Sequence, residues 1–129
     1  MTTKGYLHQI HPVLPVTNVV AALDFYVNRL GFKIGFADDA KKPTYAGVLR
    51  DGIEIHLQWH DAKEWEVAVD RPMLRIVTQN IDELYGEFSE KDVFHAHTLL
   101  RETAWGTREF AFYDPFKNGL TFYAEVKAT

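Results

Sequence analysis

The pattern of apolar and polar residues occurs twice along the chain. In the first half an alternating, strand-like run leads to Asn18 and then to the amphipathic segment Val19–Leu30. In the second half a similar run leads to Asn80 and Ile81–Ser89. Apolar residues recur in both segments every three or four positions, the spacing of one buried helical face, and asparagine is a favoured N-cap. Further strand-like segments follow each helix, so the pattern predicts a βαβββ unit that occurs twice.

The expected strands are short, and most of them alternate between apolar and polar side chains. In the first unit they are Leu7–Val16, Lys33–Ala37, Tyr45–Arg50 and Ile53–Trp59, and in the second they are Met73–Thr78, Ala96–Glu102, Thr107–Tyr113 and Leu120–Val126. Asp51-Gly52 is a hairpin signal between two of these strands. The charged segment His60–Val69 is the expected connector between the two units.

Composition places these units in one globular domain. The chain has 129 residues, of which 47% are hydrophobic and 14% aromatic, enough for a packed interior. We predict a single α+β domain over residues 1–129, with modules at about residues 7–60 and 70–127. The sequence contains no cysteine, which excludes disulfides, a thiolate nucleophile and zinc–thiolate sites.

Charge and targeting signals narrow the expected partners. The formal net charge of −4 disfavours nucleic acid and permits a cationic small molecule. The segment Met1–Gly5 lacks the apolar stretch of a signal peptide. No segment approaches the roughly 18 apolar residues of a membrane span. We therefore expect a soluble, cytoplasmic protein without a nucleic-acid or membrane partner.

Two motifs resemble a known superfamily. The run from His11 to Tyr26, followed by Leu30-Gly31-Phe32, resembles the opening of the vicinal oxygen chelate superfamily, the glyoxalase, bleomycin resistance and dioxygenase proteins. The closing run Trp105–Phe110, with the turn Asp114–Asn118, is similar to the last hairpin of the bleomycin resistance proteins in particular. Lys117 stands where that turn usually has glycine. The resemblance covers about residues 7–126.

The resemblance implies a U-shaped cleft formed by the strands of the two modules, with the helices packed outside. It also implies a homodimer that exchanges an N-terminal strand or a whole module. Strand alternation then predicts which side chains line the cleft. Tryptophans near it are either core residues or walls that stack a flat ligand. The predicted ligand-binding residues are His11, Glu54, His56, Gln58, Trp59, Trp65, Met73, Arg75, Trp105, Thr121 and Tyr123, and Val13 joins the lining.

The resemblance also provides a test for a metal. In the metalloenzymes of the superfamily four strands each supply one ligand, and the matching positions here are His11, His56, Met73 and Thr121. Methionine and threonine are poor ligands for a hard divalent ion. We therefore predict no metal and no other cofactor, as in the bleomycin resistance proteins. The alternative is a divalent metal on His11 and His56, completed by Glu54 or Glu109.

The leading interpretation is a binding protein. The sequence contains no nucleophile–base pair, phosphate-binding glycine loop or dinucleotide motif, so no catalytic residue is predicted. We expect a non-catalytic homodimer of the bleomycin-resistance type that sequesters an aromatic small molecule, and the acidic chain permits that ligand to be cationic. A metal-dependent glyoxalase- or dioxygenase-type enzyme using His11 and His56 is the alternative. A third interpretation is a dimerising module whose cleft binds nothing in particular.

Overall fold

The structure, a computed structural model, describes residues 4–67 and 70–126. Within them the strands form two four-stranded sheets, ordered β1-β4-β3-β2 and β5-β8-β7-β6. The first unit comprises β1 (Val13–Val16), α1 (Val19–Asp24), a π-helical turn η1 (Phe25–Arg29), β2 (Lys33–Ala37), β3 (Tyr45–Arg50) and β4 (Ile53–Trp59). After a 3₁₀ turn η2 (Ala62–Trp65), the second comprises β5 (Met73–Val77), α2 (Ile81–Ser89), β6 (Arg101–Glu102), β7 (Thr107–Tyr113) and β8 (Gly119–Glu125). The predicted α+β fold with two βαβββ units is confirmed.

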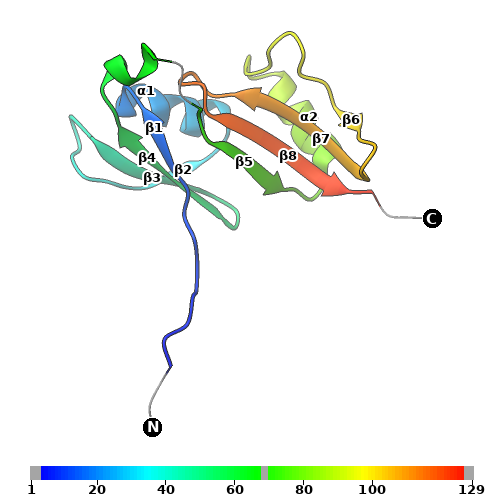
Figure 1. Cartoon of the computed structure of the whole chain (residues 1–129), viewed down its shortest axis with the longest axis horizontal. Coiled ribbons are helices and arrows are strands. Elements are labelled where there is room, and N and C mark those ends of the chain that lie inside the picture. Colours follow the sequence, from blue (N-terminus) through cyan, green and yellow to red (C-terminus); the bar gives the residue numbers. More distant parts are fainter. Residues whose placement is uncertain (1–3, 68–69, 127–129) are drawn as a thin grey trace.

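Both helices cover the same side of the two sheets. In Figure 1 the sheets lie next to each other, α1 and α2 lie behind them, and the front faces remain uncovered. The core therefore lies between sheets and helices. In the second unit Phe88 of α2 packs edge-on against Phe110, Phe112 and Phe122, with ring centroids 5.4–6.3 Å apart. Among the described residues, no helix is long and apolar enough to cross a membrane.

The strand register confirms the predicted alternation in β4. This strand pairs in parallel with β1, which places Val13 beside His56 and Leu14 beside Leu57. Leu14, Ile55 and Leu57 are buried under the helices. Because successive side chains of a strand point to opposite faces, Glu54, His56 and Gln58 lie on the open face.

The first strand is shorter than predicted. We expected strand structure from Leu7, but β1 begins at Val13, and the preceding residues run away from the body as an extended arm (Figure 1). The reason is Pro12, which has no N–H to donate to β4, so the parallel ladder ends at Val13 although β4 continues back to Ile53. The last backbone bond before β1 runs from the His56 N–H to the carbonyl of Pro12.

Three other predicted features also differ from the structure: one strand, the geometry of the first helix and one helix cap. The predicted strand Ala96–Glu102 is reduced to β6, and the residues before it form turns and irregular chain. The first helix changes to π geometry at Phe25, where the Leu30 N–H bonds to the Phe25 carbonyl. Asn18 caps α1 as predicted, whereas Asn80 has φ +55° and makes no side-chain cap to α2. Ala68 and Val69 of the predicted connector lie outside the described residues.

A buried polar turn fastens the second unit to the first. Asp114 accepts a hydrogen bond from the Tyr26 hydroxyl, which belongs to the first unit, at 2.9 Å. Asn118 donates from its amide to Asp114 and to the carbonyl of Pro15 in β1. Burial raises the pKa of Asp114, although the bonds from Asn118 and Tyr26 oppose that rise. Lys117 in this turn has φ +71°, the left-handed conformation in which glycine is unstrained.

Candidate functional site

The open face of the first sheet carries an aromatic cluster around His56. The Tyr45 hydroxyl is 2.7 Å from His56 Nδ1, and the Phe36 ring meets the imidazole edge-on at 5.2 Å. Phe36 and Tyr45 are themselves stacked, with centroids 6.0 Å apart. Gly47 lies directly opposite His56 in β3, and a Cβ there would come within 2.3 Å of the Phe36 ring. The glycine thus lets Phe36 lie flat across the sheet beside the imidazole.

Two more side chains complete a polar centre next to this cluster. Glu54 Oε2 lies 2.6 Å from His56 Nε2 and 3.4 Å from His11 Nδ1. His11 comes from the base of the arm, and its Nε2 is 2.9 Å from the amide oxygen of Gln9. The side chains of His11, Glu54 and His56 are 30%, 27% and 15% exposed. The structure therefore brings together three of the predicted site residues at one accessible point.

The four-position metal site of the superfamily does not fit this chain. Met73 and Thr121 occupy two of those positions, and the Thr121 hydroxyl donates to the Met73 sulfur at 3.3 Å. Met73 also covers Gly119, since a Cβ there would lie 2.4 Å from its terminal methyl. A thioether and a hydroxyl bonded to each other are weak donors for a divalent ion. Only the His11 and His56 half of that site offers strong ligands, and Glu54 is the carboxylate beside them.

The open face of the second sheet carries a different group. Arg75 donates to Glu109 at 3.1 Å and lies over the Tyr123 ring at 4.3 Å. Glu109 also accepts from Thr107 at 2.8 Å. Burial alone would raise the pKa of Glu109. The hydrogen bonds from Thr107 and Arg75, together with the positive charge of Arg75, lower that pKa instead. Arg75 was predicted to line the cleft, and the structure pairs its guanidinium with Glu109.

The three tryptophans lie in different environments. Trp65 packs against the core, donates its indole N–H to the Phe116 carbonyl at 3.1 Å and is covered by Arg71 at 4.0 Å. These contacts are those of a core residue, one of the two roles that the sequence left open for it. Trp59 follows Ile55 and Leu57 in alternation, so it lies on the opposite face of β4 from His56. Trp105 is exposed in the turn between β6 and β7, beside the outer edge of the second sheet.

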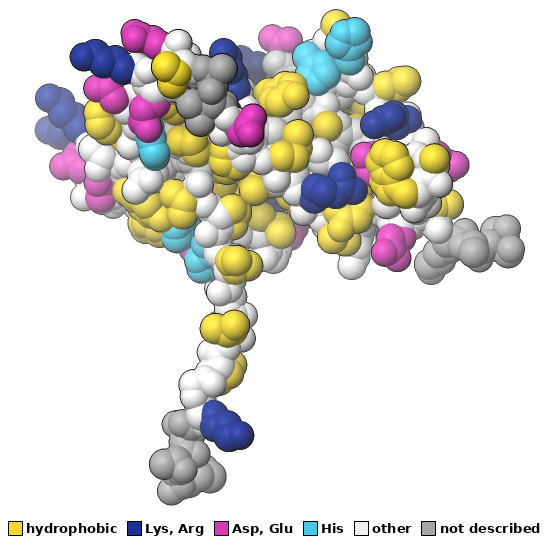
Figure 2. All heavy atoms as spheres, in the orientation of Figure 1, with side chains coloured by type: hydrophobic (Ala, Val, Ile, Leu, Met, Phe, Trp, Pro, Cys, Tyr) yellow, Lys and Arg dark blue, Asp and Glu magenta, His cyan; other side chains and the backbone are white. Residues whose placement is uncertain are grey.

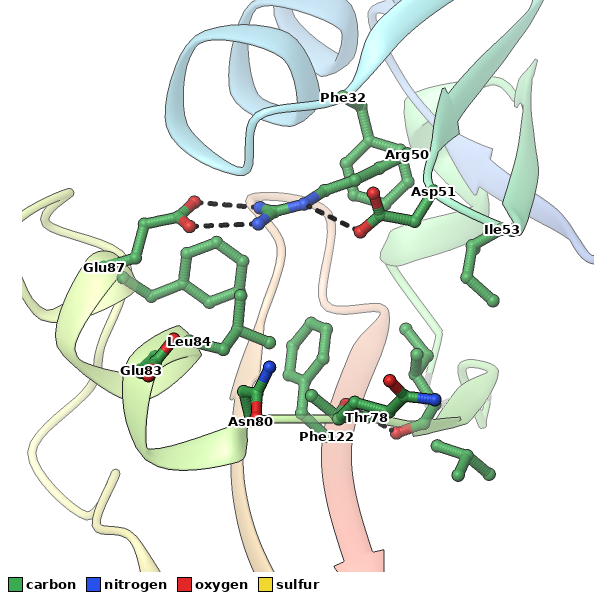
Figure 3. A pocket seen from close by; sticks show the side chains of 15 residues that line it. Phe32, Arg50, Asp51, Ile53, Thr78, Asn80, Glu83, Leu84, Glu87 and Phe122 are labelled. Carbon is green, nitrogen blue, oxygen red and sulfur yellow. Dashed lines mark hydrogen bonds and ion pairs between the residues drawn. The ribbon is translucent and has the colours of Figure 1, made fainter.

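Two cavities lie along the seam between the units. One, of about 640 Å³, begins at His11 and Glu54 and extends along β5 past Arg75. The other, of about 600 Å³, lies between the β3–β4 hairpin and α2 and contains none of the predicted site residues (Figure 3). Across it Arg50 donates two hydrogen bonds to Glu87, at 2.8 and 2.9 Å, and so ties α2 to the first sheet. The first cavity adjoins the open face at His11, Glu54 and Arg75.

Sequence reasoning missed the aromatic members of the site. Tyr45 could have been found, because the two-residue Asp51-Gly52 turn fixes the β3–β4 register and sets Tyr45 opposite Gln58. Phe36 could not, because the β2–β3 pairing shifts by one residue between Ile34 and Phe36. That bulge places Phe36 opposite Gly47 on the open face. Regular alternation would place it with Ile34 on the face that the helices cover.

Comparison with known proteins agrees with this architecture. The sequence model of a family described as "Glyoxalase superfamily protein" matches residues 2–129. The bleomycin resistance protein of Geobacillus stearothermophilus is 29% identical over 132 residues, covering 91% of this chain and 96% of that protein. A bleomycin resistance protein of Staphylococcus aureus matches to the same extent.

Solved structures share the fold. The bleomycin-binding protein of Streptomyces verticillus, solved with copper(II)-bleomycin, superposes with a TM-score of 0.75 at 26% identity and covers 97% of this chain and 100% of its own. The bleomycin resistance determinant of transposon Tn5 gives a TM-score of 0.76 at 19% identity, covering 92% and 98%. The match extends over nearly the whole chain in both cases.

Proposed function

The chain belongs to the glyoxalase superfamily, and from this we propose that it is a non-catalytic binding protein of the bleomycin-resistance type. Its curated relatives at 29% identity are bleomycin resistance proteins, and the match covers 91% of the chain. A protein of that type protects by holding the antibiotic, so affinity alone suffices.

One observation carries the proposal for this chain itself. The open face of the first sheet presents Phe36 and Tyr45 as stacked rings beside the partly exposed His56. A flat aromatic ligand lying on these rings would gain roughly 0.5–1.5 kcal/mol per aromatic pair beyond the area it buries. Glu54 at the same point and the net charge of −4 favour a ligand with positive charge.

The proposed form of the protein is a homodimer. Tyr6, Leu7 and Ile10 of the arm are 80%, 102% and 92% exposed, so these apolar side chains are covered only if another chain meets them. Figure 2 shows further hydrophobic side chains on the open faces of both sheets, with histidines where the arm meets the body. A second copy, with its own arm and open faces, supplies a matching surface and closes each cleft.

Sedimentation of the 14.9-kDa chain tests the dimer. We expect a species of twice that mass at micromolar concentration and a shift toward monomer in Ile10→Asp, because the charge would be buried in the contact. Leu99→Asp is the matched control, since Leu99 is also exposed but lies in the loop before β6. A wild-type monomer at 50 µM, or equal effects of both substitutions, would contradict the dimer.

Titration with metal-free bleomycin, followed by tryptophan fluorescence, tests the ligand surface. Phe36→Ala should weaken binding about tenfold or more, the equivalent of about 1.4 kcal/mol, because it removes one stacking ring and its contact area. Leu99→Ala should bind like the wild type. An aminoglycoside of similar positive charge but without aromatic rings should bind much more weakly. Equal affinity of Phe36→Ala and wild type would rule out this face as the ligand surface.

A further inference from the structure

A cavity of ligand size lies between the β3–β4 hairpin and α2, and we call it the α2 cavity. Its volume of about 600 Å³ lies within the range of small-molecule pockets, which form preferentially where two units of a fold meet. We propose that the α2 cavity binds a small apolar molecule that carries one ammonium group. The proposal does not depend on the antibiotic surface, because none of the predicted ligand-binding residues lines this cavity.

The walls of the α2 cavity are apolar and come from both units. The side chains that form them, several of which Figure 3 labels, are Phe32 and Ile53 of the first unit and Ile76, Leu84, Phe88 and Phe122 of the second. Apolar packing does not close the gap between the units, because Arg50 spans it with its two hydrogen bonds to Glu87. A ligand with an apolar body therefore gains free energy by removing these walls from water.

The charged side chains of the α2 cavity favour a cation over an anion. They are one guanidinium, from Arg50, and three carboxylates, from Asp51, Glu83 and Glu87. Arg50 is already occupied, because it donates to both carboxylate oxygens of Glu87 and to the Leu30 carbonyl at 2.6 Å. An anionic ligand would have to break these hydrogen bonds. Glu83 makes no ion pair within the described part of the chain, so its carboxylate is available to a cation.

Asn80 adds a neutral acceptor at the same place. It stands at the start of α2 with φ +55°, and its side chain makes no cap to the helix. Figure 3 shows this side chain directed from α2 toward the cavity. Backbone held in the left-handed region occurs preferentially at ligand sites. A primary ammonium group has three donors, which the amide oxygen of Asn80 and the carboxylates of Glu83 and Asp51 would accept.

The test uses three molecules that share one rigid aliphatic cage: 1-adamantylammonium, 1-adamantanol and 1-adamantanecarboxylate. None has an aromatic ring to stack on Phe36 and Tyr45. Each is titrated into the full-length protein and followed by backbone amide chemical shifts. We expect saturable shifts at Thr78, Glu83 and Leu84, with a Kd of about 0.1–1 mM for the ammonium compound, which has about eleven non-hydrogen atoms. The alcohol should bind about fivefold more weakly and the carboxylate at least tenfold more weakly.

Two variants locate the bound molecule, and both residues line the α2 cavity only. Glu83→Gln should weaken the ammonium compound about threefold and leave the alcohol unchanged, because it removes only the charge. Leu84→Ala should weaken both compounds about threefold, because it removes apolar contact area. Glu90→Gln, at the end of α2, and Glu54→Gln, in the cavity on the open face, are the matched controls and should bind like the wild type.

Three results would overturn the proposal. The first is the absence of saturable shifts at Thr78, Glu83 and Leu84 with up to about 10 mM of the ammonium compound. The second is equal affinity for the ammonium compound and the alcohol, which would exclude a cation as the ligand. The third is a larger loss in Glu54→Gln than in Glu83→Gln, which would place the cation on the open face. Bleomycin binding is measured separately with Phe36→Ala, so failure of one site is distinguishable from failure of the other.

Discussion

The buried hydrogen bond between Tyr26 and Asp114 should hold the two units of the fold together. Tyr26 is fully buried, and its hydroxyl is one of two donors to Asp114 Oδ2; the other is the amide of Asn118. Tyr26→Phe keeps the ring and removes that single bond. A hydrogen bond to a charged group contributes about 1.5–3 kcal/mol, so we expect the free energy of unfolding to fall by about 2 kcal/mol.

Urea denaturation at one fixed protein concentration measures this loss, since the apparent stability of a dimer depends on concentration. With a slope of about 2 kcal/mol per M, the midpoint should fall by about 1 M. Tyr113→Phe is the matched control, because Tyr113 is exposed; its midpoint should stay within the equivalent of about 0.5 kcal/mol. A Tyr26→Phe midpoint that equals the wild type would refute the reasoning.

The same hydrogen bond should also affect how the free energy of unfolding depends on pH. Burial, followed by the charge of Asp114, raises the pKa of Tyr26 well above its usual 10.0. A group with a raised folded-state pKa binds its proton more tightly when folded, so its contribution is complete below pH 10 and is lost as pH rises through the folded value. The wild type should therefore lose stability above about pH 10 more steeply than Tyr26→Phe.

Three further substitutions probe separate features. Lys117→Gly should raise the melting temperature, because glycine relieves the strain of φ +71°, on the order of 1 kcal/mol; a fall would contradict the turn geometry. Gly47→Ala should leave stability within about 1 kcal/mol but weaken bleomycin binding, since its Cβ displaces the exposed Phe36 ring; unchanged affinity in a fluorescence titration would exclude that displacement. Trp105→Ala should weaken binding about tenfold if a partner chain brings this exposed indole to the cleft; unchanged calorimetric affinity of the folded variant rejects that role.

The fold was predictable because its signals are local. The Asn18 cap, the helical spacing after it and the Asp51-Gly52 turn are each readable within a few residues, and together they position α1 and the β3–β4 hairpin. The length of β1 was overestimated, because alternation from Leu7 was followed across Pro12, whose missing N–H ends the ladder with β4. Alternation shows which face a side chain takes, but not whether the backbone groups of the segment find a partner.

The site was predictable only in part, for a similar reason. Alternation placed Glu54 and His56 on the open face correctly, since β4 is regular. It could not place Phe36, which depends on the bulge in β2, or show that Glu54 reaches both His11 and His56. The sequence left Trp65 as either a core residue or a ligand wall, and it could not show that the carbonyl of the distant Phe116 accepts its indole N–H. These contacts join segments far apart in the sequence.

The central claim, that this chain binds an antibiotic of the bleomycin type, is tested most directly by calorimetric titration of the wild-type protein with metal-free bleomycin. The proposal predicts saturable binding of about one ligand per chain, with a Kd on the order of 1 µM or tighter, and a negative heat-capacity change from apolar burial. Folded wild-type protein that gives no saturable heat at ligand concentrations up to about 1 mM, at two temperatures, would contradict it.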